Sequence, residues 1–181
     1  MFGKVSAMYE SFDLNTTECE EFLRAGLVGR VAACTPDGPH IVPVNYSVVD
    51  DAIVLRTTPY SLLGSQTRGA VMALEVDQFD YEYHRGWSVL ARGRAEMVVD
   101  ADELEHIRQT WNPTAWAAGG RTLYLRIRWT ELTGRRLGQG WDPMAALPVH
   151  RSGRGRSPHS PGTTTLPRVG TATDPEQREE R

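Results

Sequence analysis

Residues 28–58 read VGRVAACTPDGPHIVPVNYSVVDDAIVLRTT, and this stretch decides the fold. Turn formers separate three runs of small and β-branched apolar residues, which cover residues 29–34, 40–49 and 52–58. Pro36 and Gly38 favour a turn after the first run, and Asp50 and Asp51 favour one after the second. Consecutive strands with such short connections are typical of an antiparallel meander. Pro43 lacks an amide hydrogen, so it indicates a strand edge, a bulge or an opening in the sheet.

The rest of the chain adds three strands and two or three short helices to this meander. Alternating or apolar patterns predict strands near 70–79, 87–99 and 122–132. A helix is expected first, with Thr17 and Glu20 as a capping box, and others near 60–68 and after Asp100. Because the strands do not alternate regularly with helices, a parallel sheet is excluded. The sequence predicts a mainly β fold, a six-stranded antiparallel barrel with short helices.

Composition sets limits on the domain organisation and on the partners. The chain has 181 residues and a net charge of −3, which does not favour nucleic-acid binding. It shows no leader pattern and no apolar run of ~20 residues, so we expect a cytoplasmic protein without a membrane contact. The histidines and the two cysteines lack metal-ligand spacing, so no metal site is expected. We expect an N-terminal extension at 1–13, a barrel domain at 14–140 and a disordered tail rich in Pro, Gly and Arg at 148–181.

The sequence contains no recognisable nucleophile and base arrangement, so the catalytic residues stay unknown. The most informative polar residues follow the third strand, where Arg56 and Thr57 precede a short helix that begins near Ser61. Arginine, hydroxyl groups and free helical amides together favour a phosphate. The alternative is an exposed arginine at the barrel edge.

Several stretches resemble the FMN-binding split barrel of the pyridoxamine 5'-phosphate oxidase-like proteins, whose strands form a Greek key. The clearest is PHIVPVNY at 39–46, which resembles the family pattern P-x-x-x-P-V-N-Y. The others are LVGRVA at 27–32, LRTTP at 55–59, EVDQFD at 75–80 with GWSVLARGRA at 86–95, and LTGRRL at 132–137. Their order and spacing cover residues 14–137.

The resemblance implies a homodimer with two flavin sites at its interface. By position, the isoalloxazine ring would lie beside Val42, Pro43, Val44 and Asn45. Arg56 and Thr57 would hold the phosphate, with Ser61 at the helix start. Contacts from the partner subunit would come from Trp87, Ser88 and Val89, although Trp87 can equally be a core aromatic. A substrate pocket would use Trp111, Trp116 and Arg135, although the two tryptophans can equally form a structural lid.

One departure from the family pattern leaves the cofactor open. Many relatives carry a lysine that contacts the phosphate where this chain has Leu62, and Arg68 is a candidate substitute. We therefore expect an FMN-dependent oxidoreductase that acts on an unknown small molecule, with two alternatives. One is a deazaflavin-dependent reductase, whose acidic cofactor tail would need a basic groove made by Arg56, Arg68, Arg85 and Arg121. The other is a flavin-binding module without catalytic activity.

Overall fold

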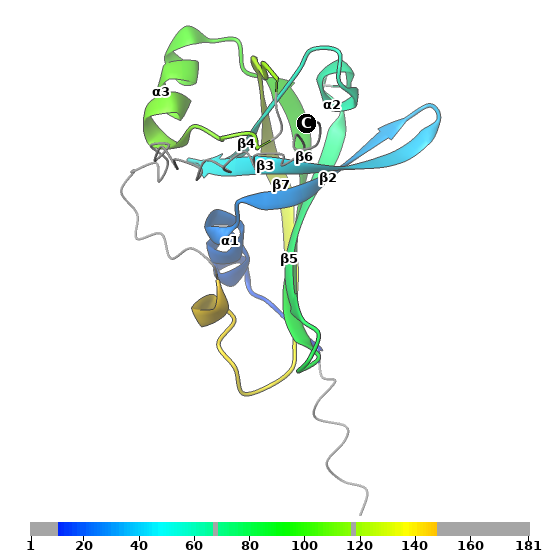
Figure 1. The fold of residues 1–181 in the computed structure, drawn as a ribbon, viewed down its shortest axis with the longest axis vertical. Helices are drawn as coiled ribbons and strands as arrows, with labels where there is room; N and C mark the ends of the chain where they lie inside the picture. Colours follow the sequence, from blue (N-terminus) through cyan, green and yellow to red (C-terminus); the bar gives the residue numbers. More distant parts are fainter. Residues whose placement is uncertain (1–10, 67–68, 117–118, 148–181) are drawn as a thin grey trace, which may run out of the picture.

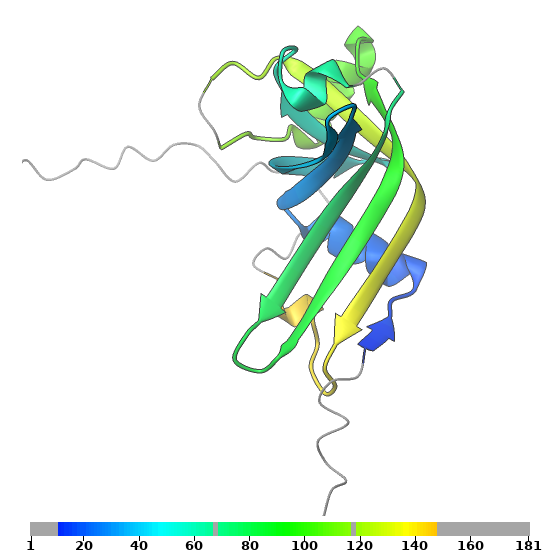
Figure 2. The ribbon, with the colours of Figure 1, turned by 90° about the vertical axis from the view of Figure 1, so that its right-hand side faces the viewer.

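Six antiparallel strands form a closed barrel (Figures 1 and 2). The computed structural model describes residues 11–66, 69–116 and 119–147. Within them the barrel order is β7-β4-β3-β2-β5-β6, and β6 pairs again with β7 to close it. The strands are β2 (Val28–Thr35), β3 (Gly38–Val49), β4 (Ala52–Thr57), β5 (Val71–Asp80), β6 (Arg85–Met97) and β7 (Leu123–Leu137). The predicted mainly β barrel is confirmed.

A short seventh strand extends the sheet beyond the barrel. β1 (Ser11–Asp13) pairs with the end of β7, where Phe12 lies opposite Arg136. The expected extension at 1–13 therefore ends in a strand, which three residues are too few to reveal by alternation. Residues 1–10 and the predicted tail at 148–181 lie outside the described residues.

Strand β3 changes its partner halfway, and this creates the opening of the barrel. Residues 38–45 pair with β2, whereas residues 46–49 pair with β4. Pro43 lies in the first half, opposite Arg30. The edge of β3 that faces away from β2 is unpaired there in the described part of the chain, so the missing amide hydrogen of Pro43 costs no ladder hydrogen bond on that edge. The prediction that Pro43 marks an edge or an opening therefore agrees with the structure.

Helix α1 (Thr16–Ala25) packs against the inner side of the long strands (Figure 1). It begins with a capping box two residues before the predicted one: the Glu18 amide donates to the Asn15 Oδ1 atom at 2.9 Å, and the Asn15 amide donates to the Glu18 carboxylate at 2.8 Å. The predicted box of Thr17 and Glu20 is therefore wrong. Both pairs have the required spacing of three residues, so the pattern alone did not select between them.

Two further helices and a 3-10 turn complete the fold. Helix α2 (Leu62–Ser65) begins after Ser61, as predicted. Helix α3 (Ala101–Trp111) is capped by Asp100, as predicted, because the Asp100 side chain accepts a hydrogen bond from the Glu103 amide at 2.8 Å. The short turn η2 (Met144–Ala146) follows β7. None of the helices in the described part of the chain is long and apolar enough to cross a bilayer.

Two apolar clusters hold these elements together. The larger fills the barrel and reaches α1, where the Phe22 and Trp87 rings stack with centroids 4.5 Å apart. Burial there also raises the pKa of the Cys19 thiol, so this side chain packs as a neutral group. The smaller cluster lies between α3 and the outer face of β4 and β7, around Ile107 and Tyr124. Each element that borders the barrel opening is thereby attached to a packed core.

Candidate functional site

A pocket of about 170 Å³ lies at the opening between β3 and the end of β4, and we call it the opening pocket. Seven of its lining residues were predicted as cofactor contacts from the sequence: Val42, Pro43, Val44, Asn45, Arg56, Thr57 and Ser61. The remainder are Leu62, Leu63, Ala115 and Arg121. The change of partner along β3 explains the location, because among the described residues no strand pairs with this half of β3 on the side of β4.

The walls of the opening pocket differ in polarity along its length. Valine and proline side chains of β3 make one apolar wall, and Leu62 and Leu63 of α2 add another. Arg56 and Arg121 supply two positive charges, and no carboxylate is among the lining residues. Apolar walls with a few convergent polar groups suit a planar organic ligand, and the arginines favour an anionic group at one end.

The hydroxyl groups of the pocket are engaged with one another. Ser61 Oγ donates to the Thr58 carbonyl at 2.8 Å and accepts from the Gly64 amide at 3.0 Å. The contact of 2.6 Å between the Thr57 and Ser61 hydroxyls is then satisfied with Thr57 as the donor. Since both hydroxyl protons are used within the protein, these two hydroxyl groups are not available as donors to an anion.

Arg56 is the better placed of the two arginines for such an interaction. Its Nε atom donates to the Arg121 carbonyl at 2.9 Å, and its guanidinium lies over the Tyr124 ring with the central carbon 5.2 Å from the ring centroid. Within the described part of the chain, no hydrogen bond or ion pair is formed by its two terminal nitrogens. These atoms are therefore the available charged donors of the site.

The residues predicted to reach a partner's cofactor lie elsewhere on the barrel, in β6. Trp87 and Val89 are 3% and 1% exposed, so their side chains belong to the core of this chain. The alternative interpretation of Trp87 as a core aromatic therefore describes its side chain here. Ser88 alternates with them and points to the outer face, where it lies opposite Arg135 of β7. Its contact with a partner's ligand stays a prediction.

The predicted substrate residues are only partly brought together. Trp116 is 73% exposed, but its backbone amide donates to the Asn45 Oδ1 atom at 2.9 Å, which fixes its loop beside the opening pocket. The Trp111 carbonyl accepts from Ser47 Oγ at 2.9 Å, which anchors the start of this loop. Arg135 is exposed, forms an ion pair with Asp13 at 3.3 Å and does not line the pocket. Arg68 lies outside the described residues.

Sequence reasoning missed two residues of the opening pocket and assigned two others to a different role. Ala115 and Leu63 have no distinguishing pattern, and a loop and a helix turn bring them to the site. Leu62 was singled out only as the replacement of a lysine. Arg121 was named for a basic groove together with Arg85, but Arg85 instead pairs with Asp80 at 3.1 Å in the β5–β6 hairpin.

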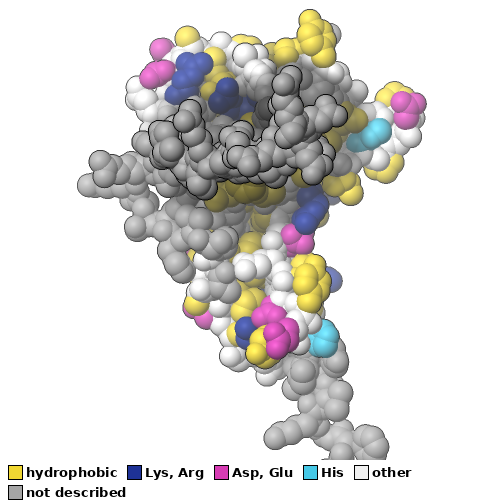
Figure 3. Space-filling view, viewed as in Figure 1, with side chains coloured by type: hydrophobic (Ala, Val, Ile, Leu, Met, Phe, Trp, Pro, Cys, Tyr) yellow, Lys and Arg dark blue, Asp and Glu magenta, His cyan; other side chains and the backbone are white. Residues whose placement is uncertain are grey.

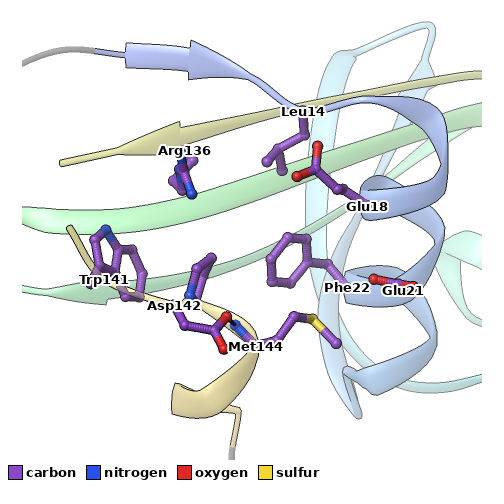
Figure 4. A pocket seen from close by; sticks show the side chains of 9 residues that line it. Leu14, Glu18, Glu21, Phe22, Arg136, Trp141, Asp142 and Met144 are labelled. Atoms are coloured by element: carbon purple, nitrogen blue, oxygen red, sulfur yellow. Dashed lines mark hydrogen bonds between the residues drawn. The ribbon is translucent and has the colours of Figure 1, made fainter. Parts of the chain in front are cut away.

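A second pocket, of about 260 Å³, lies beside α1, and we call it the α1 pocket (Figure 4). Its walls come from α1, the end of β7 and the segment that follows β7. The charged lining residues are Glu18, Glu21, Asp142 and Arg136. With three carboxylates to one arginine, the α1 pocket is less suited to an anion than the opening pocket.

The comparisons with known proteins agree with the fold and with the sequence pattern. The family profile described as pyridoxamine 5'-phosphate oxidase matches residues 15–136. An uncharacterized protein of Mycobacterium tuberculosis is 29% identical over 133 residues, which is 71% of this chain and 86% of that protein. A structure of the FAD binding protein from Mycobacterium smegmatis is 29% identical, with a TM-score of 0.60, over 70% of this chain and 98% of that chain.

A third similar protein extends the comparison beyond mycobacteria. A conserved protein of unknown function from Corynebacterium diphtheriae is 26% identical, with a TM-score of 0.58, over 70% of this chain and 98% of that chain. The family profile covers more than half of this chain, including every strand from β2 to β6 and nearly all of β7. The chain therefore belongs to the pyridoxamine 5'-phosphate oxidase family.

Proposed function

We propose that the protein is a flavin-dependent oxidoreductase that binds FMN in the opening pocket and acts on a small molecule in the cytoplasm. The observation that carries this proposal is the convergence of seven predicted cofactor residues on one pocket with two arginines and no carboxylate. The similarity to an FAD binding protein at 29% identity supports the flavin class of cofactor.

The chemistry of the opening pocket fits the two ends of FMN. The apolar β3 wall suits the flat ring system, and the unpaired side of β3 leaves backbone groups available to polar atoms of the ring. Arg56 would bind the phosphate through its terminal nitrogens, with Arg121 adding positive charge. When bound, a flavin supplies the electron-transfer chemistry, while the protein supplies binding, orientation and exclusion of water.

Leu62 favours a second candidate for the cofactor, a deazaflavin. An apolar side chain lines the pocket where many relatives have a lysine for the phosphate, so the phosphate interaction here depends more heavily on Arg56 and Arg121. A deazaflavin-dependent reductase would use the same apolar wall and the same arginines. A flavin-binding protein without turnover would also use this pocket, and it differs only in failing to transfer electrons.

We propose further that two copies assemble through the outer face of β3, β2, β5 and β6. Apolar side chains on this face are unusually exposed, namely Ile41 at 70%, Val71 at 51%, Val28 at 44% and Leu90 at 39%. They alternate with the core residues of the same strands, so they share one face. Figure 3 shows exposed apolar side chains at the β2–β3 hairpin. Exposed apolar side chains that share one face with the ion pairs of Arg30 with Glu75 and Asp77 are consistent with an interaction surface of mixed polarity.

The first experiment is the visible absorption spectrum of the purified full-length protein, followed by titration with FMN and with a deazaflavin. A band near ~450 nm or saturable FMN binding supports the proposal, and mixing the complex with nicotinamide donors then separates an enzyme from a binding module. Binding of the deazaflavin without binding of FMN favours the second candidate, a deazaflavin cofactor. Failure to bind either would contradict the whole assignment. Light scattering on the same sample tests the dimer, which a monomeric mass would refute.

A further inference from the structure

Arg56 is held by two contacts that leave only one end of its side chain available. The Nε atom is bonded to the Arg121 carbonyl, and the guanidinium plane lies over the ring of Tyr124. Arg56 and Tyr124 are direct partners in the β4–β7 ladder, so the strand pairing itself brings the cation over the ring. Together the two contacts determine where the terminal nitrogens point.

Tyr124 is itself fixed from several sides. It is 5% exposed and packs in the smaller apolar cluster with Ile107 of α3. Its hydroxyl donates to the Asn112 Oδ1 atom at 2.9 Å, just after the end of α3. A second guanidinium, that of Arg108, lies 5.7 Å from the ring centroid. The ring is therefore held from several sides by contacts within the protein.

We propose that Tyr124 is a positioning residue that presents the terminal nitrogens of Arg56 to the phosphoryl group of the cofactor. This inference rests on the proposed function and deepens it. An arginine whose orientation is set before binding loses less conformational entropy when it binds an anion. It therefore binds the anion more tightly than an arginine with a mobile side chain does. Because Thr57 and Ser61 use their protons internally, they do not donate to the phosphate, and the geometry of Arg56 contributes correspondingly more to its affinity.

The test compares FMN with riboflavin, which has the same ring system but no phosphate. We measure the ratio of the two dissociation constants by flavin fluorescence for the wild type, Tyr124→Phe and Tyr124→Leu. The ratio isolates the phosphate interaction, because a general loss of structure would weaken both ligands equally. Tyr124→Leu should reduce the preference for FMN about three- to thirtyfold, the range expected for loss of a cation–π contact. Tyr124→Phe keeps the ring and should retain most of the preference.

Each outcome of this comparison bears on a different claim. If Tyr124→Leu keeps the wild-type preference, the positioning role is refuted while the FMN assignment stands. If the wild-type protein binds both ligands equally, Arg56 does not recognise a phosphate, and both the assignment and the positioning role are overturned. Should Tyr124→Leu not fold, Tyr124→Met replaces it, since an unbranched side chain fills irregular space in a core more readily.

Discussion

The opening pocket and the α1 pocket lie on the same barrel but differ in charge. The α1 pocket is the larger, at about 260 Å³ against about 170 Å³. It is lined by three carboxylates and one arginine, whereas the opening pocket has two arginines and no carboxylate. Volume alone would select the α1 pocket as the site. Charge and strand pairing favour the opening pocket for the phosphate-bearing ligand that we propose.

The two pockets also differ in how each holds its arginine. Arg56 has its Nε atom bonded to a carbonyl, and its terminal nitrogens remain available at the pocket. Arg136 has a buried Nε atom with no hydrogen-bond partner in the described part of the protein, and its guanidinium lies 5.4 Å from the centroid of the Phe12 ring. Arg56 is therefore oriented by a hydrogen bond as well as by an aromatic ring, whereas the described contact of Arg136 is with an aromatic ring.

The largest expected difference in FMN affinity comes from removing the arginine charge of each pocket in turn. Arg56→Gln should weaken FMN binding on the order of ten- to a hundredfold, because charge-assisted hydrogen bonds contribute about 1.5–3 kcal/mol. Arg136→Gln is the matched control in the α1 pocket and should leave the affinity within about twofold of the wild type. Fluorescence titration of both variants measures the difference. Equal losses in the two variants would show that the pockets were assigned wrongly.

Adding a cation to either pocket tests the same assignment through a gain of FMN affinity. Leu62→Lys places a cation in the opening pocket, and it should tighten FMN binding about three- to tenfold, since one added charge contact is worth about 1 kcal/mol. Glu21→Lys adds a cation to an exposed position of the α1 pocket and should have no such effect. Titration with FMN and riboflavin checks that the gain depends on the phosphate. A gain for Glu21→Lys but not for Leu62→Lys would reverse the assignment.

The smallest expected effect is a loss of stability with no change in FMN binding. Asn15→Ala removes the cap of α1 and should lower the free energy of unfolding by about 1 kcal/mol, while the FMN affinity stays unchanged. Thr17→Ala, the matched control, removes the residue that the sequence suggested as the cap and should cost less than about 0.5 kcal/mol. Urea denaturation monitored by circular dichroism measures both. A larger loss for Thr17→Ala would contradict the observed capping box.

Local sequence patterns predicted the barrel and one side of the site well. The meander of 28–58 carries strong turn formers and β-branched runs, and Pro43 marked the opening because its missing amide hydrogen has few tolerated positions. The cap at Asp100 followed from the same kind of local rule. The meander brings together the middle of β3, at residues 42–45, and the end of β4 with the residue that caps α2, namely Arg56, Thr57 and Ser61.

What the sequence did not reveal depends on packing between distant segments. Ala115 lies at the opening pocket beside a backbone contact of Trp116 with Asn45, and the Arg121 carbonyl is held there by Arg56. The stacking of Arg56 on Tyr124 depends on the register of β4 with β7, which separates the two residues widely in sequence. Whether Trp87 faces inward or outward was decided by the register of β6, because a shift of one residue reverses the faces.

The most direct test of the account is the crystal structure of the protein with FMN. We expect the phosphate within hydrogen-bonding distance, about 2.7–2.9 Å, of the terminal nitrogens of Arg56, with the ring system along residues 42–45. A phosphate bound instead at Arg136 in the α1 pocket, or a flavin ring that makes no contact with β3, would contradict the assignment of the opening pocket as the cofactor site.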